Sequence, residues 1–138
     1  MEKTEMKKDV PSEPMCSKVM LTSRLLVAAI FVMSAYGKIT GFTAQAVFAG
    51  SSWLALPGEL LLGAAILMEV FGAIALISGW RYNLGVKVLI FYTIMTTIMF
   101  HIGEGQAMNL LKNLAIIGGL LAMTLLKPGK YSYNGKEE

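Results

Sequence analysis

The sequence is short of almost everything that a soluble protein needs. Of its 138 residues, 15% are charged, whereas soluble domains average about 25%. One cysteine excludes an internal disulfide, and one histidine is a poor donor set for zinc, haem or iron–sulfur sites. Phosphate-loop and dinucleotide-binding spacings are also absent, as are Ser-His-Asp and Cys-His arrangements. We therefore exclude a soluble domain, a disulfide-framed secreted module and a nucleic-acid binder, and expect neither a metal site nor independent catalytic activity.

Charge is scarcest in the middle of the chain, where long apolar runs take its place. Fourteen of the 21 charged residues lie in 1–24 and 127–138, which leaves seven for the 102 residues between them. Four runs of about 20 residues each would span roughly 30 Å as helices, the thickness of the hydrocarbon core. The sequence predicts an all-α bundle of four transmembrane helices in one domain, residues 19–126. The predicted helices are 19–39, 59–79, 83–102 and 108–126.

The flanking segments predict the orientation of the bundle. Residues 1–18 carry mixed charge and two prolines, and we expect them, like 127–138, to be tails outside the membrane, the first of them disordered. An even number of spans places both tails on one side, which holds ten Lys and Arg residues against Lys38 and Lys112 on the other. This asymmetry predicts cytoplasmic termini. The aromatic segment 40–58 is too short to span and is expected to be a short interfacial segment at the outer end.

Glu69 is the most informative single residue, because it lies near the middle of the second run. A carboxylate facing lipid at that depth costs about 3 kcal/mol. Ala65, Gly72 and Ala73 share its helical face, and small residues let a second helix approach closely. We expect Glu69 to point into the bundle, where it is paired, hydrogen-bonded or protonated. Two roles remain open: a polar clamp between helices, or proton handling and ligand binding.

Further polar residues are expected at the ends of the helices. Those at the outer end form either a pocket that opens outward or a rim of snorkelling side chains. Arg24, at the cytoplasmic head of the first run, is either an interfacial anchor or the partner of an acidic group or anionic ligand. The outer residues are Lys38, Glu59, His101, Glu104, Lys112 and Asn113. The pocket hypothesis assigns binding to Glu69, Lys38, Lys112, His101, Asn113 and Arg24, and no metal.

Several short motifs occur in a fixed order along the four runs. They are Arg24, Ser34–Ile39 (SAYGKI), Met68–Gly72 (MEVFG), Leu76–Gly79 (LISG) with Arg81, and Lys112–Gly119 (KNLAIIGG). Through these residues, over about 20–126, the chain resembles the DoxX-like family of small membrane proteins. The resemblance implies a four-helix bundle with both termini inside, located in the inner membrane as a multi-pass protein.

The resemblance implies two functions, because family members are linked to quinol oxidase, thiosulfate oxidation and oxidative-stress complexes. The first is an accessory or scaffold subunit of a redox-linked membrane complex, held by a membrane or periplasmic protein partner or by homo-oligomerisation. The alternative is a quinone- or quinol-binding redox component. In it, Glu69 or His101 would accept a proton and Lys38 or Lys112 would hydrogen-bond a carbonyl. Proton-coupled transport fits four short helices less well.

Overall fold

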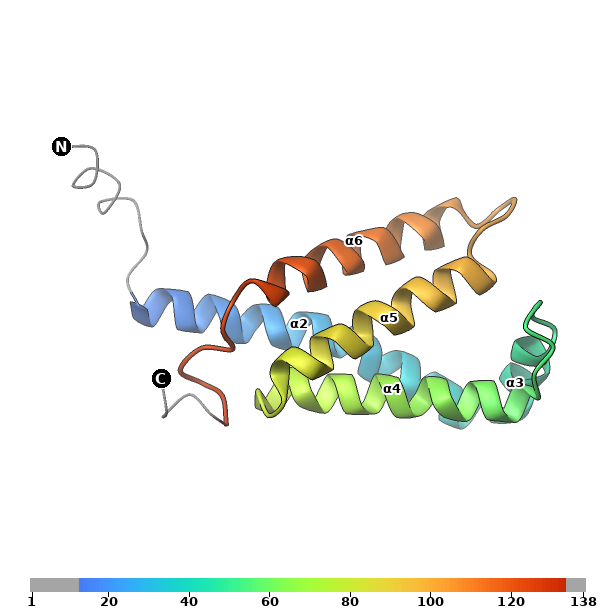
Figure 1. Cartoon of the computed structure of the whole chain (residues 1–138), viewed down its shortest axis with the longest axis horizontal. Coiled ribbons are helices and arrows are strands. Elements are labelled where there is room, and N and C mark those ends of the chain that lie inside the picture. Colours follow the sequence, from blue (N-terminus) through green and yellow to red (C-terminus); the bar gives the residue numbers. More distant parts are fainter. Residues whose placement is uncertain (1–12, 134–138) are drawn as a thin grey trace.

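The computed structural model describes residues 13–133, and within that range the chain forms helices and no strand (Figure 1). Four helices are long and apolar enough to cross a bilayer. They are α2 (Glu13–Thr40), α4 (Gly58–Ser78), α5 (Tyr82–Phe100) and α6 (Ala107–Thr124). The shorter α3 (Phe42–Gly50) connects the first two. The predicted all-α fold with four spans is confirmed.

The first helix extends beyond the predicted apolar run. It begins at Glu13, so residues 13–18, which we expected in the N-terminal tail, are helical. Pro14 falls in the first turn, where a missing N–H removes no intrahelical bond. Hydropathy marks where lipid contact begins, whereas a helix continues until the backbone is interrupted. Residues 1–12 and 134–138 of the predicted tails lie outside the described range.

Close packing between α4 and α5 depends on two glycines. A Cβ atom at Gly72 would overlap the side chain of Leu89, and one at Gly85 would overlap Ala75. The two helices therefore approach closely beside the short turn that joins them. Buried apolar side chains from all four long helices surround this contact. They include Ala28, Phe31, Leu76, Val86, Leu89 and Leu120.

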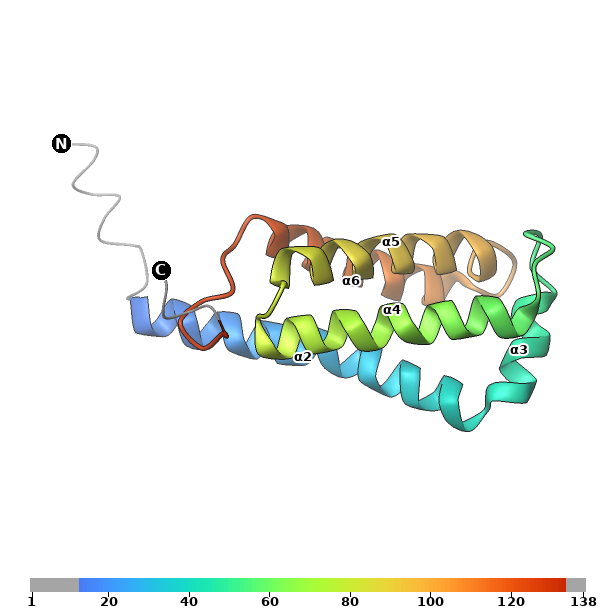
Figure 2. The same ribbon diagram turned by 60° about the horizontal axis from the view of Figure 1, so that its bottom comes forward.

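The bundle opens away from that turn. In Figure 1, α5 and α6 diverge from α4 and α2 toward the end that carries α3, which we call the α3 end. There α3 packs on the start of α4, with Gly58 against the backbone of Ala46. The ring of Phe48 in α3 also stacks on Phe100 of α5, with centroids 5.0 Å apart. Within the predicted interfacial segment 40–58, Phe42–Gly50 is thus a helix that lies across this end (Figure 2).

Arg24 holds together the opposite end, which we call the Arg24 end. Its side chain is fully buried, and Nε and Nη2 donate to the carbonyls of Leu76 and Ile77 at 2.6 and 2.7 Å. Nη1 donates to Pro128 at 2.6 Å and to Tyr131 at 3.1 Å. The last carbonyls of a helix lack intrahelical partners, so Arg24 caps α4. The same side chain ties the segment after α6 back onto the bundle.

Candidate functional site

A cavity of about 640 Å³ lies between the diverging helices. All five helices contribute to its wall, which is largely apolar. Phe31 lines it from α2, Met68 from α4, Met95 and Met99 from α5, and Ile116 from α6. Small-molecule sites typically measure roughly 300–1,000 Å³ and place a few polar groups in an apolar wall. This cavity has the size and composition of such a site.

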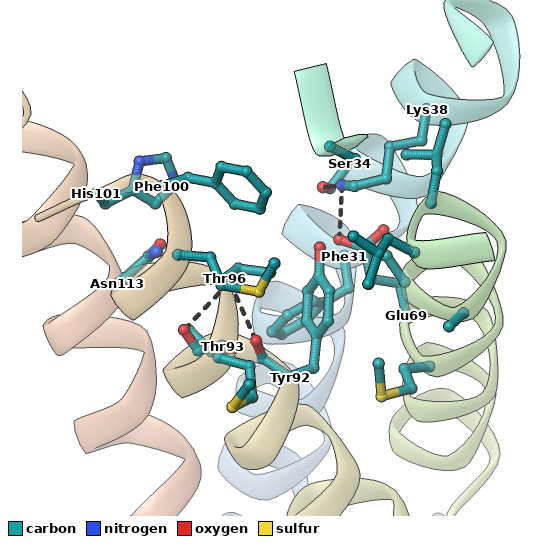
Figure 3. Close-up of a pocket in the computed structure, with 18 of the residues that line it drawn as sticks. Phe31, Ser34, Lys38, Glu69, Tyr92, Thr93, Thr96, Phe100, His101 and Asn113 are labelled. Carbon is teal, nitrogen blue, oxygen red and sulfur yellow. Dashed lines mark hydrogen bonds and ion pairs between the residues drawn. The ribbon is translucent and has the colours of Figure 1, made fainter. Parts of the chain in front are cut away.

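A buried ion pair forms one polar part of the cavity wall (Figure 3). Lys38 Nζ lies 3.1 Å from Glu69 Oε1 and donates to Ser34 Oγ at 2.5 Å. Glu69 is fully buried, and the Lys38 side chain is 16% exposed. Helical side chains lean toward their own N-terminus, and α2 and α4 run in opposite directions. Lys38 therefore leans into the bundle while Glu69 leans toward the α3 end, and the two meet.

Aromatic side chains lie next to this pair. The ring of Tyr92 packs edge-to-face against Phe31, with centroids 6.3 Å apart, and its hydroxyl points toward Ser34 and Glu69 (Figure 3). Lys38 Nζ lies 5.8 Å from the centre of the Tyr92 ring. The second carboxylate oxygen, Glu69 Oε2, is buried, and the Tyr92 hydroxyl is the donor that lies beside the carboxylate. Lys38, Ser34, Glu69 and Tyr92 therefore form one polar cluster at the cavity wall.

The facing wall carries a second set of polar groups, from α5 and α6. Asn113 is buried and donates to the hydroxyl of Thr97 at 2.9 Å. His101, at the end of α5, lies with Nδ1 3.2 Å from Gln106 Oε1. Lys112 is exposed, and its ammonium is 3.4 Å from an amide oxygen of the same helix. Polar groups therefore reach the cavity from both sides of the opening.

The structure brings five of the six predicted site residues to one cavity. Arg24 is the exception, because it lies at the opposite end and its donors serve backbone carbonyls. Glu59 and Glu104 are exposed and do not line the cavity. Within residues 13–133, no three His, Cys, Asp or Glu side chains gather as a metal site would require. The five residues that line the cavity are Lys38, Glu69, His101, Lys112 and Asn113.

Sequence reasoning missed the partnership of Lys38 and Glu69 and the contribution of α3. Ser34 and Lys38 are four residues apart, which places them on one helical face and was the available signal for their contact. Gln45 and Phe48 also line the cavity, but nothing in their local pattern indicated it. Their position depends on how α3 folds back over the start of α4.

Comparison with known proteins identifies the family. Residues 19–102 match the sequence profile of the DoxX family. The chain belongs to the DoxX family. The match runs from α2 through α5, so it includes Lys38, Glu69 and Tyr92, whereas Lys112 and Asn113 on α6 lie beyond it. The resemblance noted in the sequence is confirmed.

Two relatives are inner membrane proteins of Escherichia coli (strain K12). The chain is 30% identical to YqjF over 115 residues, which cover 81% of this chain and 86% of YqjF. It is 28% identical to YphA over 122 residues, covering 83% and 86% of the two chains. No solved structure matches the chain. Together with the four spans, these relatives establish a multi-pass protein of the inner membrane, as predicted.

Proposed function

We propose that this DoxX-family protein binds a quinone or quinol in its cavity and serves as a membrane component of a redox-linked complex. One observation carries the proposal. A buried lysine–glutamate pair, with the Tyr92 hydroxyl beside its carboxylate, lies in the wall of a largely apolar cavity of about 640 Å³. Desolvation opposes a buried ion pair, and a pair that lines a cavity of ligand size can also orient a polar ligand there.

The cavity suits the chemistry of a quinone. Such a molecule joins a flat ring, which carries hydrogen-bonding oxygens, to a long apolar tail. The rings of Phe31 and Tyr92 lie beside the ion pair and offer aromatic contact to the head group. Met68, Met95 and Met99 line the remaining wall with flexible apolar side chains that adapt to a tail. The ion pair is placed to orient the head group.

Bound quinone provides the direct test. Protein purified from membranes in a mild detergent is extracted, and quinones are quantified by mass spectrometry against protein concentration. We expect a near-stoichiometric quinone in the wild type and its loss in Lys38→Met and Glu69→Gln. Lys87→Met and Glu59→Gln, which change exposed charges on α5 and α4, are the matched controls and should retain it. A wild type that neither retains nor rebinds quinone would contradict the proposal, as would retention by both cavity variants.

A second observation supports the accessory-subunit function beside ligand binding. Of the four spans, α6 has the smallest share of its residues buried within the bundle. Gly118 and Gly119 in this helix are exposed, and a Cβ added to either would meet no neighbour within 4 Å. Small residues on an uncovered helix let a partner helix approach closely. We therefore propose α6 as the face that contacts a membrane partner.

Substitution of the open glycines distinguishes this face from the rest of the surface. Gly119→Leu should abolish co-purification of a partner while leaving thermal stability near that of the wild type, because the position is open. Gly63→Leu is the matched control, since Gly63 in α4 is also free of neighbours within 4 Å. Equal partner recovery from both variants would contradict a role for α6.

A further inference from the structure

We propose that the cavity opens sideways into the bilayer between α2 and α6, and that the acyl chain of a membrane lipid enters it by this route. The route does not depend on quinone binding, because it concerns how the cavity meets the membrane and not which head group it holds. It follows from the packing of the four spans and from the depth at which exposed side chains line the cavity.

The boundary between α2 and α6, which we call the α2–α6 seam, is the loosest side of the bundle. Helix α4 packs along both α2 and α5, and α5 packs along α6, whereas α2 and α6 touch only sparsely. In Figures 1 and 2, α6 separates from α2 toward the α3 end. The four spans therefore form three close helix pairs and one open seam.

The cavity extends around α2 to the side of this seam. A stripe of residues three and four apart runs along α2 and faces α4, because its two ends contact Leu76 and Glu69 of that helix. Ile30 and Met33 also line the cavity, but they lie outside the stripe and are 36% and 66% exposed. The cavity thus continues past the flank of α2 that is turned away from α4. The stripe consists of Arg24, Ala28, Phe31, Ala35 and Lys38.

The other side of the seam is a flank of α6 that α5 does not cover. Asn113 faces α5, because its amide donates to Thr97. Lys112 and Ile116 are four residues apart and therefore share a different flank, and both line the cavity. Lys112 is exposed, and Ile116 lies near the middle of its span, as Ile30 does in α2. The seam therefore opens at the depth of the hydrocarbon core.

An acyl chain is the occupant that this depth and this wall favour. The molecules beside a transmembrane helix at mid-span are acyl chains. The cavity wall is largely apolar, and an apolar cavity holds water poorly, while an empty one forfeits dispersion contacts. At the α3 end the cavity is covered by α3, whose Phe48 stacks on Phe100 of α5. Hydrocarbon therefore fills the space more readily than water does.

Fluorescence quenching inside the cavity tests the route. In full-length protein with Trp53 and Trp80 changed to Phe, Phe31→Trp provides a single reporter that lines the cavity at a position only 4% exposed. The protein is placed in nanodiscs of phosphatidylcholine brominated at several positions along the acyl chain. We expect a clear loss of emission relative to unbrominated lipid, and little loss with iodide, which stays in water. Absence of quenching by the brominated lipid would overturn the proposal, whether or not iodide quenches.

Two further reporters calibrate the measurement. Tyr82→Trp is buried but does not line the cavity, so brominated lipid should leave its emission nearly unchanged. Ile94→Trp is exposed on α5 and should be strongly quenched. If Phe31→Trp fails to fold, Met95→Trp, which lines the cavity from α5, takes its place with the same expected loss.

Substitutions that narrow the seam locate the entrance. Ile30→Phe combined with Ile116→Phe enlarges a side chain on each side of it and should reduce the quenching of the Phe31→Trp reporter by brominated lipid. Ile74→Phe combined with Leu121→Phe is the matched control, because both positions are exposed and neither lines the cavity. Equal quenching in the two double variants would contradict entry between α2 and α6.

The outcomes separate this route from the proposed function, because the quenching assay contains no quinone. Quinone retention without quenching by brominated lipid would leave the proposed function in place and show that the sideways route is wrong. Quenching by brominated lipid in a protein that neither retains nor rebinds quinone would support the route and contradict quinone binding.

Discussion

At the scale of single residues, the central feature is the buried ion pair of Lys38 and Glu69, in which substitution of one partner destabilises the protein. Glu69 is fully buried and Lys38 is its only charged contact among the described residues. A buried pair contributes little net stability, because desolvation opposes the attraction between the charges, yet removing one partner leaves an uncompensated charge in an apolar surrounding. The pair should therefore show strong coupling in a double-mutant cycle.

We expect Lys38→Met to destabilise the protein by about 3 kcal/mol, whereas Lys38→Met combined with Glu69→Leu should recover most of that loss. The double variant replaces both charges with apolar side chains, so no charge remains buried alone. The measurement is the free energy of unfolding in mixed micelles as denaturing detergent is increased. Additive losses in the two single variants and the double variant would show that the pair is not coupled.

Substitution of Arg24 is expected to lower stability and to leave ligand binding unchanged. Arg24→Lys retains the charge but cannot reach the carbonyls of Leu76, Ile77 and Pro128 at once, because a lysine lacks the planar fork of donors. We expect a loss of roughly 2 kcal/mol or more in unfolding free energy. Quinol affinity of the folded protein should stay within about twofold of the wild type, within the spread of a distant substitution. A large affinity loss at unchanged stability would assign Arg24 to ligand binding after all.

At the scale of elements, the four spans could be predicted and the contacts between them could not. Run length and composition locate a membrane helix well, since lipid demands about 20 apolar residues. The start of α2 at Glu13 was missed because the polar residues of 13–18 end the apolar run but do not end the helix. The packing of α3 on α4 was missed because it depends on Gly58, whose neighbour Ala46 is twelve residues away.

The docking of α3 can be tested at that glycine. In Gly58→Ala, the new methyl group would overlap the carbonyl of Ala46, so α3 must move away from α4. We expect a destabilisation of about 1–3 kcal/mol, as for overpacked sites, together with weaker quinol binding because α3 lines the cavity. Gly63→Ala, at an open position of the same helix, is the control and should be neutral. A neutral Gly58→Ala would show that α3 is not held as described.

At the scale of the whole molecule, the charge asymmetry predicts an orientation that places the cavity toward the outer face. The Arg24 end and both flanking segments should lie in the cytoplasm, because ten of the twelve Lys and Arg residues fall on that side. Fusion of a reporter that matures only in the cytoplasm to the C-terminus should give an active protein. Activity only from a reporter that requires the periplasm would reverse the orientation.

The cavity itself was accessible to sequence reasoning only in outline. Lys38, Glu69, His101, Lys112 and Asn113 could be assigned to one region from their places along the spans. In the structure, α5 and α6 diverge from α2 and α4. This arrangement depends on the close approach of α4 and α5 at Gly72 and Gly85. Such a relation between two helices cannot be found in the pattern of either helix alone. The volume of the cavity and the Lys38–Glu69 pair in its wall appear only when the four helices are placed together.

The most direct test of the account is infrared difference spectroscopy of the Glu69 carboxylate as ligand binds. Protein labelled with ¹³C-glutamate in nanodiscs is measured before and after addition of the quinol, and the Glu69→Gln variant identifies the Glu69 band. We predict that the Glu69 carboxylate stretch shifts when the quinol binds to the wild type, and that this shift is absent from the Glu69→Gln variant. A bound quinol that leaves the Glu69 band unchanged would contradict the central claim.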